Sequence, residues 1–369
     1  MNRIGAGPRQ RGGASGEVGG VNTGKAVHGT VHKTVQRKAA SGAGAGRLVA
    51  VVVTHDRQAQ LRRTVTRLLE TAPEHLSALV VVDNASSDGT ADWLARQDDP
   101  RLQVLCEPRN RGGAGGFEAG MRYAMALCAP DWIVVMDDDA RPEPGALAAF
   151  HAAAGDTGAE AIAAAVRYPD GRICEMNRPS RNPFWRPAVF WRTLRGLVSG
   201  GVRDGYHIPR SAYGAEGRPR PVDMASFVGL FLSREAVAAA GYPRGGLFLY
   251  GDDVIYCLTL RRAGGRLAFD PRVRFEHDCS TFADDRRRVF RPLWKVYYTY
   301  RNGLIMYRTA AGPLFWLMVP LLVPKWLWTA RRYGAERAAY LRLTRRAVSD
   351  GLRGRTDLGH EAVRALSER

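Results

Sequence analysis

The chain has 369 residues, 45% of them hydrophobic, which is enough to bury a substantial core in one large domain or two. Its net charge of +18 calls for an anionic partner, and the candidates are nucleic acid, an anionic membrane surface and a phosphorylated substrate. The five cysteines are widely spaced and form no CxxC pair. This argues against a disulfide framework and a zinc site and favours a reducing compartment.

The first 46 residues are rich in Gly, Ala, Ser and Arg. They lack the apolar segment of a secretory signal, and they show no periodic pattern. We therefore expect a disordered basic arm over 1–46.

Residues 47–168 alternate between strand and helix patterns. Strands are expected at 48–54, 78–82, 102–106 and 132–136, and helices at 58–70, 88–96 and 115–127. Residues 143–154 and 159–166 continue the pattern. The alternation predicts a parallel sheet covered by helices on both faces.

Beyond residue 168 the pattern is less regular. Residues 176–222 are rich in Pro, Gly, Arg and Trp and predict a long irregular loop, of the kind that forms lids or binding loops. Order returns with helices at 234–240 and 254–263 and with extended segments at 266–269 and 273–276.

The most informative motif is a run of three carboxylates, Asp137, Asp138 and Asp139, directly after the apolar strand 132–136. Open α/β sheets bind their ligands at the carboxyl ends of strands. Adjacent like charges repel unless a cation lies among them, and Mg²⁺ and Mn²⁺ favour oxygen ligands together with substrate phosphates. We expect a metal–diphosphate site here; the alternative is a solvated acidic turn.

Other loops lie at the same edge of the predicted sheet. The first strand ends in Thr54–Arg57, and the second ends in Asp83, which is well placed to contact the base or ribose of a nucleotide. Asn110–Phe117 carries four glycines before a helix, where backbone can approach an anion closely. Ordinary turn and helix-cap roles are favoured for three polar residues: Asn84, Ser86 and Asp88. The GxGxxG and P-loop patterns are absent, which excludes a plain Rossmann dehydrogenase and a P-loop NTPase.

In this order and spacing, Thr54–Arg57, Asp83-Asn84, Asn110–Phe117 and Asp137–Asp139 resemble the family 2 glycosyltransferases of the GT-A fold. The resemblance covers about residues 47–310 and is strongest to bacterial galactofuranosyl- and rhamnosyltransferases. It implies that Asp137 and Asp139 bind Mn²⁺ or Mg²⁺ on the donor diphosphate, with Asp138 as a donor or supporting contact. It also implies a set of residues that hold the nucleotide sugar: Thr54, Arg57, Asp83, Asn110, Gly112 and Gly113.

Asp252 and Asp253 follow an aromatic stretch and open a helix. Inverting sugar transfer needs a carboxylate to deprotonate the acceptor hydroxyl. The resemblance implies that Asp253 is this base and that Asp252 orients the acceptor, whereas the pair alone would indicate helix capping. His277 ends a predicted strand, where related galactofuranosyltransferases place a third metal ligand. A solitary histidine is otherwise usually structural, and imidazole suits Mn²⁺ better than Mg²⁺.

Tyr297–Asn302 resembles a Tyr-x-x-Arg-Asn element of the same relatives. Its Arg301 would neutralise the departing diphosphate, and ordinary packing of a Tyr-rich helix is an equal alternative. In the acceptor-side strand 222–229, Met224 and Ser226 replace aromatic residues common in the family, which leaves the acceptor and the donor open.

Residues 313–328 are strongly apolar, but prolines and a lysine make the apolar runs too short for an ordinary spanning helix. Tryptophans and flanking arginines favour attachment to the bilayer interface over docking on the protein. The expected organisation is the arm 1–46, a catalytic domain 47–285 and a helical membrane-associating region 286–369. Within the catalytic domain, 47–168 would bind the nucleotide sugar and 169–285 the acceptor.

The expected fold class is α/β, with a GT-A-type, Rossmann-like, mostly parallel sheet, helices on both faces and a C-terminal helical region. The expected function is metal-dependent, inverting sugar transfer at the inner face of the cell membrane, in cell-envelope polysaccharide synthesis. The donor would be of the UDP-galactofuranose or dTDP-rhamnose type, and the acceptor a glycan or polyprenyl-diphosphate-linked molecule.

Two other functions remain as alternatives. One is a metal-dependent sugar-nucleotide phosphohydrolase. The other is a nucleic-acid-binding protein that uses the basic arm and Arg286–Arg288. This last function leaves the acidic motifs unexplained, so no nucleic-acid partner is expected.

Overall fold

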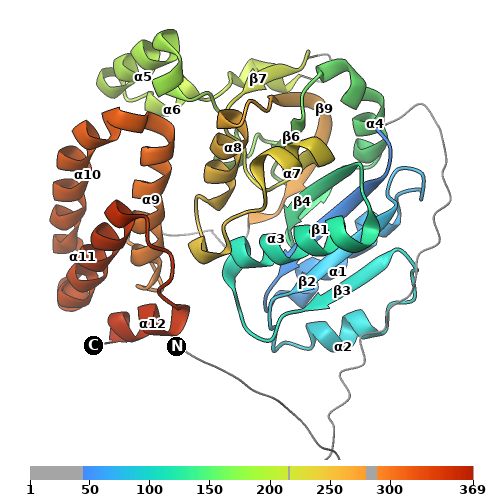
Figure 1. Ribbon diagram of the computed structural model, residues 1–369, viewed down its shortest axis with the longest axis horizontal. Helices are drawn as coiled ribbons and strands as arrows, with labels where there is room; N and C mark the ends of the chain where they lie inside the picture. Colours follow the sequence, from blue (N-terminus) through green and yellow to red (C-terminus); the bar gives the residue numbers. More distant parts are fainter. Residues whose placement is uncertain (1–44, 215–216, 280–288, 369) are drawn as a thin grey trace, which may run out of the picture. The chain divides into compact units, whose positions relative to one another are not determined.

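The computed structural model describes residues 45–214, 217–279 and 289–368 (Figure 1). Residues 1–44 of the predicted basic arm, the triplet Arg286–Arg288 and the predicted domain boundary at 285 lie outside these ranges. The described strands are β1 Leu48–Thr54, β2 Ala78–Asp83, β3 Leu102–Cys106, β4 Trp132–Asp137, β5 Ala140–Pro142, β6 Ala161–Arg167, β7 Arg220–Val222, β8 Leu230–Ser233 and β9 Leu267–His277. The described α-helices are α1 Gln58–Leu69, α2 Thr90–Ala95, α3 Gly112–Tyr123, α4 Ala146–Thr157, α5 Pro187–Ser199, α6 Val202–Tyr206, α7 Arg234–Ala240, α8 Asp252–Arg262, α9 Lys295–Ala311, α10 Phe315–Thr329, α11 Arg337–Arg353 and α12 His360–Glu368.

All nine strands join one sheet, in the order β3-β2-β1-β4-β8-β6-β9-β5, with β7 paired to β9. The pairs β3–β2, β2–β1 and β1–β4 are parallel, as predicted, so β1, β2 and β4 end at the same edge. Antiparallel β8 then separates β4 from the parallel pair β6–β9. The predicted α/β class with a Rossmann-like parallel half is confirmed.

Both faces of β1 are buried because helices cover the sheet on each side (Figure 1). Val49, Val51 and Val53 belong to the hydrophobic core that α3 closes, and the alternate residues belong to the core that α1 and α4 close. Burying each leucine or valine of this kind stabilises the fold by roughly 1.5–3 kcal/mol.

The glycines after β3 lie inside a helix, because α3 begins at Gly112 and not at the predicted residue 115. A Cβ added at Gly116 would lie 2.5 Å from Val53, and one added at Gly120 would lie 2.5 Å from Val51. Each helical glycine costs about 1 kcal/mol relative to alanine. Here the glycines let α3 pack directly on β1.

The prediction of an irregular loop over 176–222 was wrong in part, because helices α5 and α6 lie within it. Pro187 opens α5, and Gly200 ends it in a left-handed conformation. The two predicted extended segments at 266–269 and 273–276 form one strand, β9, with a register shift opposite Ala164 and Ala165.

In the C-terminal region, α10 folds back along α9 (Figure 1). The ring of Tyr300, near the start of α9, stacks on that of Trp326, near the end of α10, with centroids 4.4 Å apart. Within the described ranges, Lys295–Arg332 is the one helical stretch that is long and apolar enough to cross a membrane, but it reverses direction midway. With 15 residues, α10 alone is about 22 Å long, shorter than the hydrocarbon core of a bilayer.

Candidate active site

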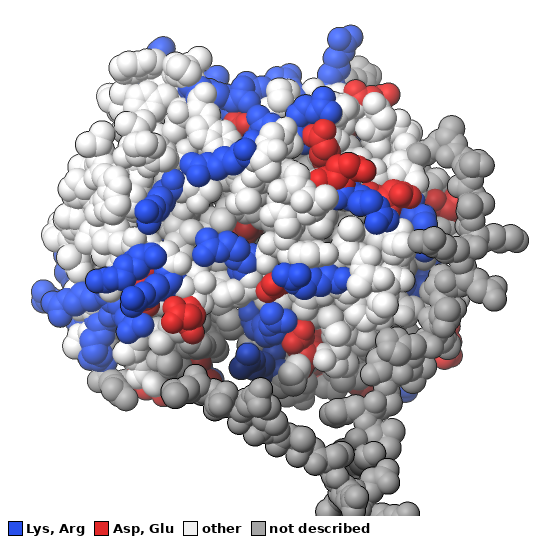
Figure 2. Space-filling view, viewed as in Figure 1, with Lys and Arg blue, Asp and Glu red and all other residues white. Residues whose placement is uncertain are grey.

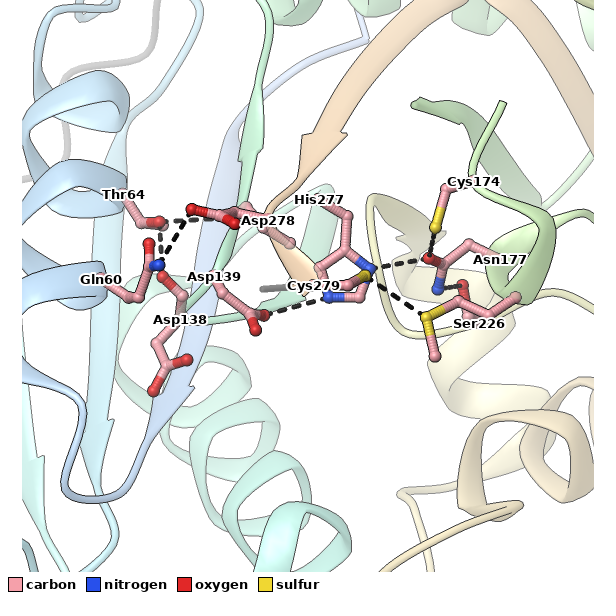
Figure 3. A network of polar contacts seen from close by, with 12 residues as sticks. Gln60, Thr64, Asp138, Asp139, Cys174, Asn177, Ser226, His277, Asp278 and Cys279 are labelled. Carbon is pink, nitrogen blue, oxygen red and sulfur yellow. Dashed lines mark hydrogen bonds and ion pairs between the residues drawn. The ribbon is translucent and has the colours of Figure 1, made fainter. Parts of the chain in front are cut away.

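Three side chains predicted to bind metal come together at the carboxyl ends of β4 and β9. Figure 3 shows two of them, Asp139 and His277. Strand β5 pairs with β9 so that Ala140 lies opposite His277, which brings the histidine beside the acidic triplet. One ligand atom each from Asp137, Asp139 and His277 lie within 4.8 Å of one another. Asp138 and Asp139 are only 3% and 2% exposed, so the alternative of a solvated acidic turn is wrong.

His277 is held by partners on both ring nitrogens (Figure 3). Nε2 lies 3.1 Å from Asp139 Oδ1, and Nδ1 lies 2.7 Å from Asn177 Oδ1. Burial would lower the pKa of His277, but the hydrogen bond and charge of Asp139, with the charge of Asp137, raise it to about 10. Because an amide oxygen only accepts, Nδ1 donates to Asn177 in this arrangement, which leaves Nε2 as the nitrogen for a cation held with Asp137 and Asp139.

The charge balance of this cluster fits a divalent cation. Burial and the charges of Asp139, Asp138 and Asp253 raise the pKa of Asp137 to about 7, although His277 acts against them. Two carboxylates and one imidazole form a ligand set that suits Mn²⁺. A cation there would offset the charge that makes ionisation of Asp137 costly.

Asp138 faces the end of β1 and not the other two carboxylates. Thr54 Oγ1 donates to Asp138 Oδ2 at 2.7 Å, and Arg57 Nη1 donates to Asp138 Oδ1 at 3.0 Å. The same Arg57 nitrogen donates to Asp139 Oδ2 at 2.7 Å. Burial raises the pKa of Asp138 to about 6, against the opposing effects of Arg57 and Thr54. Thr54 and Arg57 thus orient the acidic triplet itself, which the sequence did not predict.

Asn84 connects the end of β2 to the start of α3. Its Nδ2 donates to the Gly112 carbonyl at 2.9 Å, and its Oδ1 accepts from Arg111 N at 2.9 Å. Asn110 Oδ1 accepts from Gly112 N at 2.7 Å. Asn110, which was predicted to bind the nucleotide sugar, therefore shapes the turn that leads into α3.

Asp83 is 3% exposed at the end of β2, where its Oδ1 accepts from Ser86 N. Gly112 has φ +68°, and a Cβ there would lie 2.1 Å from the Phe248 carbonyl oxygen. Gly113 has open space beside it, since a Cβ there would meet nothing within 4 Å. Of the predicted nucleotide-sugar residues in this loop, Gly113 leaves the most room for a ligand.

Asp252 and Asp253 form the first turn of α8, after Gly251 at φ +75°. Burial raises the pKa of Asp253 to about 6, while backbone N–H groups of Val254 and Phe227 act to lower it. Burial and the adjacent Asp253 charge raise the pKa of Asp252 well above its ordinary value. The charge of Asp137 also acts on Asp252, so this pair and the acidic triplet lie in one electrostatic environment.

Arg301 is fully buried, which favours the alternative of ordinary packing over direct contact with the donor diphosphate. Its Nη2 donates to the carbonyls of Gly246 and Leu247 at 2.9 and 2.8 Å. The neighbouring Asn302 donates to three carbonyls of the same loop, at 2.8–2.9 Å: Leu247, Leu249 and Tyr250. The Arg-Asn pair therefore holds the loop that leads into Asp252 and Asp253.

We expect Asn302→Ala to loosen this loop, because it leaves buried carbonyls unpaired at a cost of about 1–3 kcal/mol. The turnover number kcat should fall at least tenfold, while nucleotide affinity changes little and the melting temperature drops. Thr309→Ala is the matched control on the same helix, because Thr309 Oγ1 donates only to the Ile305 carbonyl of that helix. An Asn302→Ala enzyme with unchanged kcat would contradict the positioning role.

Asn177 was missed by the sequence analysis. It is 7% exposed, and besides contacting His277 it donates through Nδ2 to Ser226 Oγ at 2.9 Å. It lies in a short 3-10 helix within a segment without a motif, so its position follows only from the tertiary fold.

Comparison with known proteins agrees with this site. Residues 49–211 match the family model described as Glycosyl transferase family 2. The chain is therefore a glycosyltransferase with a family 2 domain, and the acidic triplet and most of the loops around it lie within the matched residues.

Two similar glycosyltransferases show which members of the family this chain resembles. The chain is 29% identical over 270 residues to "Galactofuranosyltransferase GlfT1" of Mycolicibacterium smegmatis, covering 69% of this chain and 80% of the relative. It is 28% identical over 167 residues to "Undecaprenyl-phosphate mannosyltransferase" of Micrococcus luteus, covering 45% of this chain and 67% of the relative. The predicted resemblance to galactofuranosyltransferases is confirmed.

One of the solved structures that this chain resembles is a mannosyltransferase, PcManGT from Pyrobaculum calidifontis, in complex with GDP-Man and Mn²⁺. It is 18% identical, with a TM-score of 0.46, over 88% of this chain and 79% of that one. Residues 1–349 of S. aureus TarS are 13% identical, with a TM-score of 0.48, over 87% of this chain and 90% of that one.

Proposed function

We propose that this chain is a metal-dependent, inverting galactofuranosyltransferase. It would transfer galactofuranose from UDP-galactofuranose to a hydroxyl of a glycan or polyprenyl-diphosphate-linked acceptor in cell-envelope polysaccharide synthesis. The observation that carries the proposal is the convergence of Asp137, Asp139 and His277 near a second carboxylate pair, Asp252-Asp253. Similarity to galactofuranosyltransferases supports the choice of sugar.

In this proposal residues 47–168 bind the donor, and residues 169–285 contribute the acceptor side. Asp137, Asp139 and His277 would hold Mn²⁺ or Mg²⁺, which would neutralise charge on the donor diphosphate. Asp83 and Gly113 border the space for the nucleotide. Arg57 and Thr54 keep Asp138 and Asp139 in place.

Asp253 takes the acceptor proton as the hydroxyl attacks the anomeric carbon on the face opposite the leaving diphosphate. Its pKa of about 6 leaves it mostly ionised at neutral pH, and therefore basic. Asp252 orients the acceptor sugar beside it. Arg301 and Asn302 fix the preceding loop and touch no reacting atom.

The deciding experiment measures thermal stabilisation of the purified protein by a panel of nucleotide sugars, with and without Mn²⁺. UDP-galactofuranose should stabilise only when Mn²⁺ is present, and dTDP-rhamnose and GDP-mannose should not. Product analysis with and without acceptor then separates transfer from hydrolysis. Stabilisation by dTDP-rhamnose alone would move the assignment to a rhamnosyltransferase, and hydrolysis without transfer would support a phosphohydrolase.

The pH dependence of transfer should report the ionisation of Asp253. Its raised pKa means that it protonates at a higher pH than an ordinary aspartate, and only the carboxylate accepts a proton. At saturating Mn²⁺ we expect kcat to be level above pH 7 and to fall about tenfold per unit below pH 6. A rate that stays constant down to pH 5 would contradict the role of Asp253.

We further propose that the enzyme attaches to the cytoplasmic face of the cell membrane through helices α5 and α10. The outward side chains of α5 include Trp191, Leu197 and Val198, which are 59%, 64% and 93% exposed. On α10, Leu321 is 73% exposed and Trp328 61%. The other side of α10 packs on α9, so the predicted alternatives of docking and membrane contact apply to opposite faces of one helix.

The distribution of charged side chains supports membrane attachment through α5 and α10. The surface over α5 and α10 is largely free of charged side chains, and lysines and arginines gather at its border (Figure 2). Exposed arginines lie beside the apolar side chains: Arg192, Arg195, Arg331 and Arg332. Apolar contact combined with basic residues is the pattern of proteins that bind anionic bilayers.

Leu321→Ser should weaken binding to vesicles that contain phosphatidylglycerol about tenfold, because burying one leucine contributes about 1.5–3 kcal/mol. Cosedimentation measures the partition. Leu127→Ser is the matched control, since Leu127 is a half-exposed leucine outside α5 and α10. Equal losses in both variants, or none in Leu321→Ser, would contradict the assigned surface.

A further inference from the structure

A second group of ligand-type side chains lies next to the proposed metal site. Cys174 and Cys279, far apart in sequence, meet at His277, and one ligand atom of each of the three residues lies within 4.8 Å of the others. Both thiols are free. The wide spacing of the cysteines argued against a zinc site, but the fold brings these two together (Figure 3).

The geometry identifies which side of the imidazole faces Cys174. Cys174 Sγ donates to Asn177 Oδ1 at 2.9 Å, and His277 Nδ1 lies 2.7 Å from the same oxygen. Cys174 Sγ and His277 Nδ1 therefore both face Asn177 Oδ1. Nε2, on the other side of the ring, faces Asp139.

We propose that Cys174, Cys279 and His277 Nδ1 form a second cation site, for a thiophilic divalent ion such as Zn²⁺, whose occupation removes His277 from the catalytic metal site. The second half of this statement rests on the function proposed above. Thiolate and imidazole ligands select Zn²⁺ over Mg²⁺ and Mn²⁺, and two thiolates with one imidazole leave a fourth position for water. Binding releases to solvent the proton of each thiol and the proton that Nδ1 donates to Asn177, which leaves a neutral imidazole protonated on Nε2.

Mutual exclusion follows from the single exchangeable proton of a neutral imidazole. A cation on Nε2 requires that the proton lie on Nδ1, which then donates to Asn177. A cation on Nδ1 requires that the proton lie on Nε2, where it donates to Asp139 and leaves no lone pair for Mn²⁺. The thiophilic ion therefore acts as an inhibitor that leaves the acidic triplet intact.

Co²⁺ is the probe for the thiol site, because thiolate ligation produces a charge-transfer absorption band in the near ultraviolet. We expect the wild-type protein to show this band, Zn²⁺ to abolish it, and both Cys279→Ser and Cys174→Ser to lack it. Cys106→Ser is the matched control, since Cys106 is exposed and does not belong to the cluster. Thermal unfolding verifies that the variants fold. If Cys174→Ser, at a buried position, does not fold, Cys279→Ser at its half-buried position still tests the site.

Absence of the band in the wild type, or its persistence in both cysteine variants, would overturn the site. The inhibitory role has its own test: Zn²⁺ added at one equivalent should reduce Mn²⁺-dependent transfer at least tenfold in the wild type and much less in Cys279→Ser. Equal sensitivity of the two proteins would overturn the exclusion. If instead no sugar nucleotide binds with Mn²⁺, the proposed function fails while the cobalt band still reports the thiol site.

Discussion

Replacing Asp253 with asparagine is expected to lower kcat by about 10²–10⁴-fold, the usual contribution of a positioned general base. The amide has nearly the same shape but does not accept the acceptor proton. Nucleotide-sugar affinity in the presence of Mn²⁺ should change little, because Asp253 is assigned to the acceptor side. Single-turnover transfer and isothermal titration with UDP measure the two quantities.

The neighbouring carboxylate provides the comparison for this variant. Asp252→Asn removes an acceptor contact and should raise the KM for acceptor more than it lowers kcat. The kcat of this variant should still fall below pH 6, as in the wild type. The residual kcat of Asp253→Asn should not show this fall. Retained turnover in Asp253→Asn would remove the base assignment.

Asp139→Asn is expected to abolish Mn²⁺ binding and to lower transfer by about 10³-fold or more. A bound cation contributes several kcal/mol to stabilising the leaving charge, and 1.36 kcal/mol corresponds to tenfold in rate. The substitution also breaks the contacts of Asp139 with Arg57 and His277, so Mn²⁺ affinity should be measured directly by electron paramagnetic resonance.

Asp138→Asn is the matched variant within the same triplet. Its carboxylate already accepts hydrogen bonds from Thr54 and Arg57, so the Mn²⁺ affinity of Asp138→Asn should stay within about tenfold of the wild type. Equal loss of Mn²⁺ in Asp138→Asn and Asp139→Asn would show that the triplet binds the cation as a unit. Normal transfer after removal of divalent ions with a chelator would contradict metal dependence altogether.

Much of the parallel half could be predicted because its signals are local. The runs 48–53 and 132–136 are apolar throughout, as is typical of strands with both faces covered. The parallel order then brings their carboxyl ends to one edge, so the position of the acidic triplet followed from the chain alone.

The rest depended on contacts between distant segments. The amphipathic helix α5 was missed because its apolar face is turned outward in a segment rich in Pro, Gly and Arg. Arg301 was identified through a family motif, but only the tertiary fold shows that carbonyls of the loop before α8 surround it. No local pattern pairs Asn177 with His277, which lies a hundred residues further along the chain.

The loop before α8 depends on contacts with helices that lie far beyond it in the sequence. Phe248 and Tyr250 hold positive φ angles of 64° and 71°, which such residues adopt only when their surroundings impose them. Phe248 stacks on Tyr298 from α9 and on His360 from α12, so both helices help to impose this shape. A fragment that ends after His277 would therefore lack the helices that hold the loop before Asp252 and Asp253. We expect such a fragment to bind nucleotide but not to transfer sugar.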